Sequence, residues 1–235
     1  MSGKVFLIPI VISEDTQQDV LPSQIAATIK ECDFFLVENI RTARRFISSL
    51  KLGIEIEALQ FEILDKKTTH EDCFDLVQPT LEGKNIGIMS ESGCPGIADP
   101  GAKLVHMAHQ LGVQVTPLVG PSSILMALMA SGFNGQSFTF HGYLPIDKRE
   151  RSNTLKKLEK ESNELDRTQI FMDTPYRNEQ LLNDMIKTLR PDTWLCIAKD
   201  ITGKSEFIKA QPINKWKKQK VNLHKVPTMF LIYAK

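Results

Sequence analysis

The stretch Asn85–Gly132 constrains the fold of this chain more than any other. An apolar strand is predicted over 85–90, a helix over 102–111 and a second strand over 113–118. The loop Gly93–Gly101, which separates the first strand from the helix, contains three glycines and two prolines. Two strands joined by one helix, with short loops between them, predict a parallel strand–helix–strand unit.

The loop before the helix is predicted to bind a small ligand. Asp99 is a suitable N-cap residue, Pro100 suits the first helical position, and Gly112 is expected to end the helix. In open α/β sheets, ligands bind at loops that follow the carboxyl ends of the strands. Dense glycine and proline also form plain turns, but a second such loop opens at Gly120-Pro121 and favours binding.

The rest of the chain continues the alternation of strands and helices, apart from a polar loop expected over Val11–Leu21. This pattern predicts an α/β protein of two domains, 1–118 and 119–235. The expected strands are 4–10, 33–37, 137–143, 168–173, 194–199 and 227–234. The expected helices begin at Pro22, continue at 41–50, 71–81 (ended by Gly83), 121–131 and 147–164, and close with 178–189.

Composition excludes several classes of protein. The 235 residues carry a net charge of +1, which argues against wrapping nucleic acid by bulk charge. The four cysteines form no C-x-x-C pair, so reduced thiols are expected rather than disulfides or a zinc site. No stretch approaches the ~20 apolar residues of a membrane span. We therefore expect a cytoplasmic protein.

Several motifs resemble one known family, in order and over nearly the whole chain. Ser90–Gly101 resembles the SDAGTPxISDPG signature of the tetrapyrrole methylase superfamily, and Val119–Ser123 is similar to the PGPSA motif of its 16S ribosomal RNA 2′-O-ribose (cytidine) methyltransferase branch. Further matches to that branch are Ser131–Phe133 (SGL), Phe140–Pro145 (FxGFLP), Ile170–Arg177 (xFYESPHR) and Lys199–Thr202 (RELT).

The resemblance implies a methyltransferase that uses S-adenosylmethionine. It implies a mainly parallel N-terminal sheet, a mixed C-terminal sheet, a cofactor cleft between two α/β domains, and a homodimer. Because the sulfonium donor is already activated, such an enzyme mainly positions the reactants. The residues expected to bind the cofactor are Pro9, Glu91, Ser92, Gly93, Ile97, Gly120, Ser122, Ser123, Met172, Ala198 and Thr228.

A ribose hydroxyl must also lose its proton when it is methylated. Glu38 and Lys199 are the candidate bases, with Arg41 or Arg177 as an anchor for an anion. The expected acceptor is small-subunit ribosomal RNA.

Two loops depart from the ribosomal branch. Ile8–Asp15 lacks the glycine and asparagine of TPIGNLxD, and Glu38–Arg44 replaces EDTRHTR. Both loops face the acceptor in the family, so donor binding is better supported than the ribosomal substrate. The alternatives are methylation of a tetrapyrrole or other small molecule, and a non-catalytic module that binds the donor or RNA.

Four other patterns were weighed. Ala198–Ser205 has the spacing of a phosphate loop, but a phosphate loop must run into a helix. Phe207 instead looks extended, so Ala198–Ser205 is expected to contain a turn between two strands, and a nucleotide hydrolase is not expected.

His106 and His109 lack a third metal ligand, so no metal is expected. We reject Cys94 as a nucleophile, and the absence of G-x-G-x-x-G disfavours a dinucleotide-binding fold.

Three basic clusters are candidate RNA-binding surfaces, although solvated helix faces explain each of them as well. They are Arg41–Lys51, Lys148–Lys157 and Lys215–Lys220. The last interleaves Trp216 with lysines, a pattern suited to single-stranded RNA.

Overall fold

The computed structural model describes residues 2–235. The chain forms two compact units, of which the first ends at Ser122 and the second spans Ser123–Lys235. Each unit is an α/β layer structure, so the predicted fold class is confirmed. The division into domains 1–118 and 119–235 stays a prediction, because compactness does not show that the parts fold independently.

A parallel sheet forms the centre of the first unit. Its strand order is β3-β2-β4-β1-β5, and every neighbouring pair is parallel. The sequence analysis missed the edge strand β3, whose Gln60, Glu62 and Ile63 are exposed and give no clear apolar alternation. The strands are β1 (Lys4–Leu7), β2 (Phe34–Val37), β3 (Gln60–Ile63), β4 (Ile86–Met89) and β5 (Gln114–Pro117).

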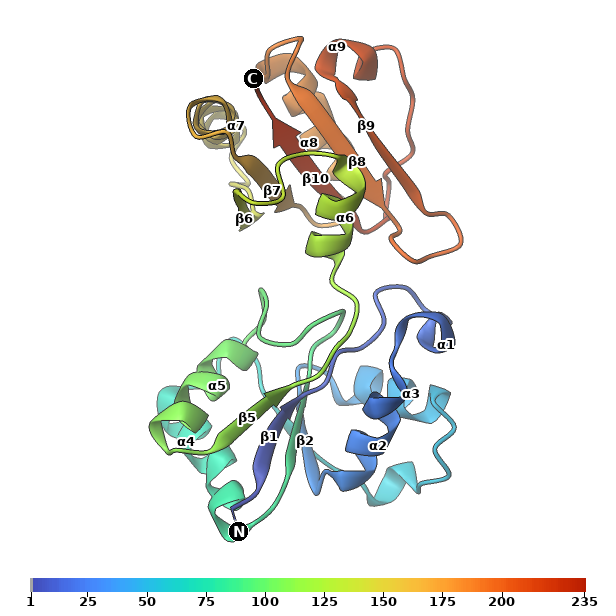
Figure 1. Ribbon diagram of the computed structural model, residues 1–235, viewed down its shortest axis with the longest axis vertical. Helices are drawn as coiled ribbons and strands as arrows, with labels where there is room; N and C mark the ends of the chain where they lie inside the picture. The colour runs from blue at the N-terminus through green and yellow to red at the C-terminus, as the bar shows by residue number, and fades with distance from the viewer. Residues whose placement is uncertain (1) are drawn as a thin grey trace. The chain divides into compact units, whose positions relative to one another are not determined.

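Helices cover both faces of this sheet (Figure 1). On one face, α2 and α3 contribute Ile25, Ile29 and Phe46 to a core with the strands; on the other, α4 and α5 contribute Val77 and Leu104 to a second core. The helices are α1 (Gln17–Val20), α2 (Ser23–Glu31), α3 (Ile40–Ser49), α4 (His70–Val77) and α5 (Gly101–Gln110), with 3-10 turns η1 (Ile56–Ala58) and η2 (Gln78–Glu82).

Three local expectations need correction. The short helix α1 lies within the segment expected to be a loop. The helix expected over 71–81 ends at Val77 and continues as η2, because the ring at Pro79 does not fit inside an α-helix. Helix α5 begins one residue early, with Pro100 rather than Asp99 in the cap position. The predicted end at Gly83 is confirmed by a φ of 94°.

The strand order creates a switch point at the carboxyl edge of the sheet. From β1 the chain enters α1 and α2 on one face, whereas from the adjacent β4 it enters α5 on the other. Loops that leave neighbouring strands toward opposite faces open a crevice in which ligands of such sheets bind.

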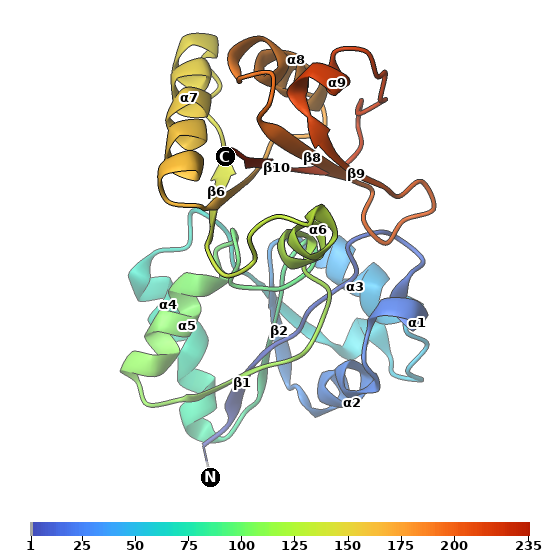
Figure 2. The same cartoon turned by 45° about the horizontal axis from the view of Figure 1, so that its top comes forward.

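The second unit contains a mixed sheet of order β6-β7-β10-β8-β9 (Figure 2). Strands β6 and β7 are parallel and the other pairs are antiparallel, so the sheet is mixed, as the family resemblance implied. The strands are β6 (Phe138–Tyr143), β7 (Thr168–Met172), β8 (Trp194–Lys199), β9 (Phe207–Pro212) and β10 (Thr228–Tyr233). The helices are α6 (Ser123–Ser131), α7 (Lys148–Glu164), α8 (Asn178–Thr188) and α9 (Ile213–Trp216).

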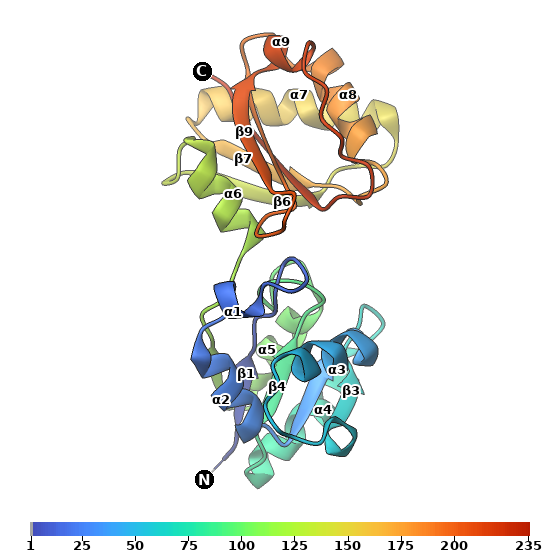
Figure 3. The same ribbon diagram turned by 90° about the vertical axis from the view of Figure 1, so that its right-hand side faces the viewer.

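The core of this unit lies between the sheet and helices α7, α8 and α9, while α6 lies on the opposite face (Figure 3). Phe171 and Phe230 stack in the core with ring centroids 6.2 Å apart, within the range of about 4.5–7 Å that is usual for aromatic pairs. Among the described residues, no helix is long and apolar enough to cross a membrane.

Candidate functional site

The loop after β4 is held in one conformation by its own hydrogen bonds. Asp99 Oδ1 accepts hydrogen bonds of 2.8 Å from the backbone N–H groups of both Gly96 and Gly101. Gly93, Gly96 and Ala98 all have positive φ, at 69°, 84° and 62°. The Asp99 carboxylate therefore holds the unusual backbone of this loop in place. We call the loop Gly93–Gly101 the locked turn.

Three loops meet at the carboxyl edge of the sheet. The Ile10 N–H donates a 2.9 Å hydrogen bond to the Gly93 carbonyl, which ties the loop after β1 to the loop after β4. A Cβ added at Gly93 would lie 3.2 Å from the Pro121 carbonyl oxygen, and one at Gly120 would lie 2.1 Å from Pro9 Cβ. The structure thus brings together Pro9, Gly93 and Gly120, three of the residues that the family resemblance implied would bind the cofactor.

The remaining predicted cofactor residues of the first unit present their side chains outward. Glu91 and Ser92 are exposed, and Ile97 keeps 55% of its surface exposed in spite of being apolar. Ser122, the last residue of this unit, is half-buried, and so is Ser123, the first residue of α6 and of the second unit.

Carboxylates accumulate at the same edge. Burial raises the pKa of Glu38, which follows β2, and the nearby negative charges of Asp99 and Glu91 raise it further, against a hydrogen bond from the Glu91 backbone N–H. Burial also raises the pKa of Asp99, whose Oδ2 is buried without a partner among residues 2–235. The sequence analysis used Asp99 only as a helix cap and missed this orphaned oxygen.

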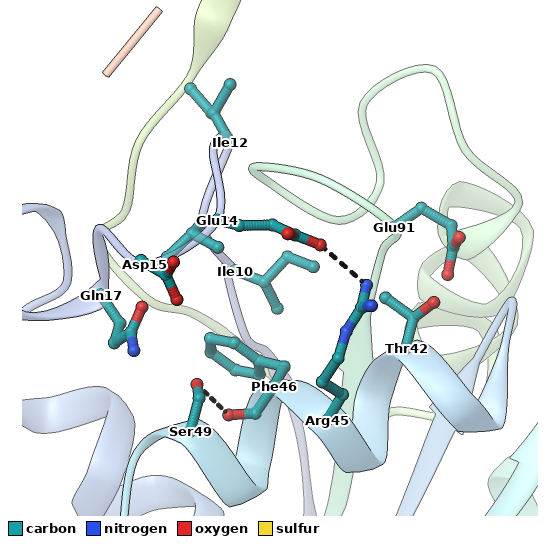
Figure 4. A pocket seen from close by; sticks show the side chains of 11 residues that line it. Ile10, Ile12, Glu14, Asp15, Gln17, Thr42, Arg45, Phe46, Ser49 and Glu91 are labelled. Carbon is teal, nitrogen blue, oxygen red and sulfur yellow. Dashed lines mark hydrogen bonds and ion pairs between the residues drawn. The ribbon is translucent and has the colours of Figure 1, made fainter. Parts of the chain in front are cut away.

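A pocket of about 300 Å³ opens beside these loops (Figure 4). Ile10 and Phe46 give it an apolar floor, and Glu14 and Arg45 pair across it at 3.1 Å. The polar residues that line it come from the loop after β1, from the start of α1, from α3 and from the loop after β4. They are Glu14, Asp15, Gln17, Thr42, Arg45, Ser49 and Glu91. Two of these segments are the ones whose sequence departs from the ribosomal branch.

The two candidate arginines differ in their surroundings. Arg41 is exposed in the first turn of α3, where the Asn39 side chain caps its backbone N–H at 2.9 Å. Arg177 instead contacts the buried Asp173 carboxylate, with Nε 2.8 Å and Nη2 2.5 Å from Oδ1. Arg41 is therefore the freer of the two to meet an anion.

In the second unit, the predicted residues lie together on neighbouring strands. Met172 and Ala198 both pair with Met229 of the strand between them, and Thr228 pairs with Lys199. Lys199 Nζ donates a 3.2 Å hydrogen bond to the Asn222 carbonyl. The roles of these residues, like those proposed in the first unit, stay predictions.

Two other patterns are resolved by the structure. Trp216, considered as a candidate ring for RNA, does not display its ring: the side chain is 1% exposed and its Nε1–H donates to the Leu195 carbonyl at 3.0 Å. The expected turn after β8 is confirmed, because the chain continues into strand β9 and not into a helix.

Cys94 is a half-buried free thiol within the locked turn. Its Sγ donates to the Pro121 carbonyl at 3.4 Å, and burial raises its pKa. A nucleophilic cysteine needs a lowered pKa, so this geometry agrees with its rejection. Throughout residues 2–235, no group of three or more His, Cys, Asp or Glu side chains is arranged to hold a metal ion.

Comparison with known proteins identifies the family. The family model for Tetrapyrrole (Corrin/Porphyrin) Methylases matches residues 19–215. This chain belongs to the tetrapyrrole methylase family. The family predicted from the motifs is thereby confirmed, and with it the class of enzyme, a methyltransferase.

Curated relatives of this methylase come from several bacteria. "Ribosomal RNA small subunit methyltransferase I" of Vibrio cholerae serotype O1 is 33% identical over 77% of this chain and 60% of the relative, so the match spans less than two thirds of that protein. The protein of the same name from Thermotoga maritima is 33% identical over 74% of each chain.

Solved structures share the fold. The methyltransferase CobJ superposes with a TM-score of 0.66 and 17% identity, over 99% of this chain and 94% of that one. Diphthine synthase superposes with a TM-score of 0.70 and 14% identity, over 100% of this chain and 90% of that one. At such low identity these likenesses establish the fold alone.

Proposed function

We propose that this methylase transfers a methyl group from S-adenosylmethionine to a ribose 2′-oxygen of small-subunit ribosomal RNA. The observation that carries the proposal is the locked turn after β4, packed against Pro9 and Gly120 in a chain of this family. The ribosomal acceptor is supported by the relatives, which are named as ribosomal RNA small subunit methyltransferases.

The first unit offers surroundings suited to the donor. S-adenosylmethionine carries a sulfonium and an ammonium group, and the carboxylates of Glu38, Glu91 and Asp99 lie at one edge of the sheet. The orphaned Asp99 Oδ2 is an acceptor for a ligand N–H or O–H that the protein itself does not supply. Glycine at positions 93 and 120 lets the three loops pack closely where a side chain would collide.

Further proposed contacts to the donor are Ser92, Ile97 and Ser122 in the first unit, and Ser123, Met172, Ala198 and Thr228 in the second. The bound donor would supply an electrophilic methyl group on a positively charged sulfur. The residues that hold it then mainly set the distance and direction of attack, which accounts for much of the rate in such displacements.

The pocket between Glu14 and Arg45 is proposed to face the acceptor. Arg41, at the exposed start of α3, is proposed to contact a phosphate of the RNA. Glu38 is proposed as the base that takes the 2′-hydroxyl proton, because its raised pKa makes it a stronger base than an ordinary carboxylate. Lys199 and Arg177 are the corresponding candidates in the second unit.

A homodimer and a cytoplasmic location complete the proposal. Leu125 and Met129 project from α6 one helical turn apart, with 51% and 81% of their surfaces exposed. Exposed apolar pairs of this kind support an interface with a second copy. The cytoplasm is where a ribosomal RNA acceptor would be found.

Two measurements test this function. Calorimetry with S-adenosylhomocysteine should give a binding isotherm, and radiolabelled S-adenosylmethionine should transfer label to small-subunit RNA from a strain that lacks the protein. Mass spectrometry of that RNA should then show one methylated ribose. RNA from a strain that contains the protein is the control and should accept no label.

Each alternative gives a different result. Donor binding without transfer to any acceptor would identify a non-catalytic module. Transfer to a tetrapyrrole but not to RNA would identify a small-molecule methyltransferase. Absence of heat with S-adenosylhomocysteine at millimolar concentration would refute the proposal as a whole.

A further inference from the structure

An exposed aromatic cluster lies at one edge of the sheet of the second unit, outside the residues proposed above. The Tyr176 side chain keeps 72% of its surface exposed, although it lies in the short turn between β7 and α8. His224 meets it edge to face, with ring centroids 6.5 Å apart at 83°. Lys225 Nζ lies 5.8 Å from the centre of the Tyr176 ring.

The two segments that carry this cluster are tied together by hydrogen bonds. The Lys225 N–H donates to the Pro175 carbonyl at 3.1 Å, and Asn178 Nδ2 donates to the Val226 carbonyl at 2.7 Å. Lys225 has a φ of 60°, an uncommon conformation for a residue with a side chain. The tyrosine and the lysine are therefore held close together by the backbone and do not meet by chance at the surface.

We propose that Tyr176 is a stacking platform for an unpaired base of single-stranded RNA, with Lys225 neutralising an adjacent phosphate. An aromatic ring next to cations is the usual means of holding single-stranded RNA, because every base has a face that stacks and every nucleotide carries a negative charge. The choice of RNA as ligand rests on the proposed acceptor.

Charge in the surrounding segment supports an RNA occupant. Lys217, Lys218 and Lys220 are exposed in the chain that leads from α9 to His224. This is the basic cluster whose tryptophan is buried in the core, and the chain that carries these lysines leads to His224 and Lys225 beside Tyr176. RNA supplies both a base that stacks on the exposed ring and a phosphate that pairs with the ammonium of Lys225.

The test compares two RNAs and matched leucine variants in fluorescence anisotropy at fixed salt. The probes are a labelled single-stranded RNA of roughly 10 nucleotides and the same RNA with abasic sugars, which keeps the phosphates and removes stacking. Tyr176→Leu should weaken binding of the intact RNA about 5- to 100-fold and leave binding of the abasic RNA unchanged. Tyr176→Phe should bind as the wild type does.

Trp194→Leu is the matched control. Trp194 is an exposed aromatic of the same unit at the opposite end of β8 from Lys199, with 44% of its surface exposed, and its loss should not change RNA affinity. A second variant, Lys225→Gln, keeps the ring and should reduce the slope of log K against log salt by about 0.7, the value for one phosphate contact on a single strand.

Two outcomes overturn the proposal. In the first, Tyr176→Leu binds intact RNA with an affinity within twofold of the wild type. In the second, the substitution lowers the affinity for abasic RNA by the same factor as the affinity for intact RNA. If Tyr176→Leu does not fold, an unchanged salt slope in Lys225→Gln overturns it. Methyl transfer by the wild type separates this site from the proposed function. Transfer to RNA without any Tyr176 effect refutes the platform alone, and a Tyr176 effect on binding without transfer refutes the methyltransferase function alone.

Discussion

Gly120→Ala tests whether the packing of the loops after β1 and β5 sets the proposed donor site. Gly120 does not have a positive φ, so its backbone conformation is open to alanine. The obstacle is contact: the added Cβ would lie 2.1 Å from Pro9 Cβ and 2.6 Å from Pro9 Cγ. Carbon atoms pack at about 3.5–4.0 Å, so one loop must move by more than ~1 Å.

Neither partner can relieve this contact by rotating a side chain. The ring of Pro9 is fixed to its own backbone, and an alanine Cβ has no rotamers. Overpacking of this kind costs about 1–3 kcal/mol of stability. A displacement of ~1 Å in a positioning element can lower turnover by roughly 100-fold. We therefore expect Gly120→Ala to lower the melting temperature and to impair both donor binding and methyl transfer.

The assays are differential scanning fluorimetry, calorimetry with S-adenosylhomocysteine, and initial rates of label transfer. Gly135→Ala is a matched control, because its added Cβ meets nothing within 4 Å and its φ is not positive. Gly112→Ala separates strain from collision: it has open space but a φ of 70°, so it should lower stability and leave the donor affinity unchanged.

The reasoning would be refuted if Gly120→Ala bound S-adenosylhomocysteine and transferred methyl groups within about threefold of the wild type, well inside the ~100-fold expected for a misplaced element. The predicted loss of stability does not depend on donor binding. Even if the wild type bound no donor, Gly120→Ala should still melt at a lower temperature than Gly135→Ala, because the collision with Pro9 does not depend on a ligand.

Two further predictions concern buried charge. Arg151 is 2% exposed, and its Nη2 lies 2.5 Å from Asp184 Oδ2, so Asp184→Asn leaves a buried cation without its counter-charge. The variant should lose about 3–5 kcal/mol of unfolding free energy. Tryptophan fluorescence should show this as a fall of about 1–3 M in the urea midpoint. Lys157→Gln, which breaks an exposed pair at 3.7 Å, is its control and should cost less than ~0.5 kcal/mol; equal costs would contradict the argument. The pKa of Glu38 is raised above its ordinary value of 4.5, so its protonated form contributes stability at low pH that is lost as the pH rises through the folded-state pKa. Glu38→Gln should therefore have a higher melting temperature than the wild type at pH 7.5 but not at pH 4. The same variant should transfer methyl groups more slowly at pH 7.5 if Glu38 is the base, and unchanged rates would remove it from that role.

Fluorescence is informative for Asp184→Asn because both tryptophans lie in the second unit, which also contains the Arg151–Asp184 pair. Arg151 further donates to the carbonyls of Pro145 and Ile146 at 3.1 and 2.6 Å. Its guanidinium thus ties the start of α7 to α8, and a variant that unpairs it should destabilise the unit that the tryptophans report.

Local sequence patterns predicted most of the elements, since each depends on residues close together in the chain. Gly83 and Gly112 end their helices with positive φ because glycine adopts that conformation at little cost. The edge strand β3 escaped detection because its pairing with β2 gives it structure that its own residues do not specify. Helix α9 was missed for a similar reason: it is short and depends on the core beneath Trp216.

For the candidate site, the sequence alone determined which loops are rich in glycine and which family the motifs resemble. Both properties reside in contiguous residues whose backbone preferences are local. Only the tertiary structure decided that Gly120 rests on Pro9, that Glu38 has carboxylates beside it, and that Tyr176 and not Trp216 displays its ring. Each of these depends on contacts between residues far apart in the chain, and burial and electrostatics follow from those contacts and not from the order of neighbours.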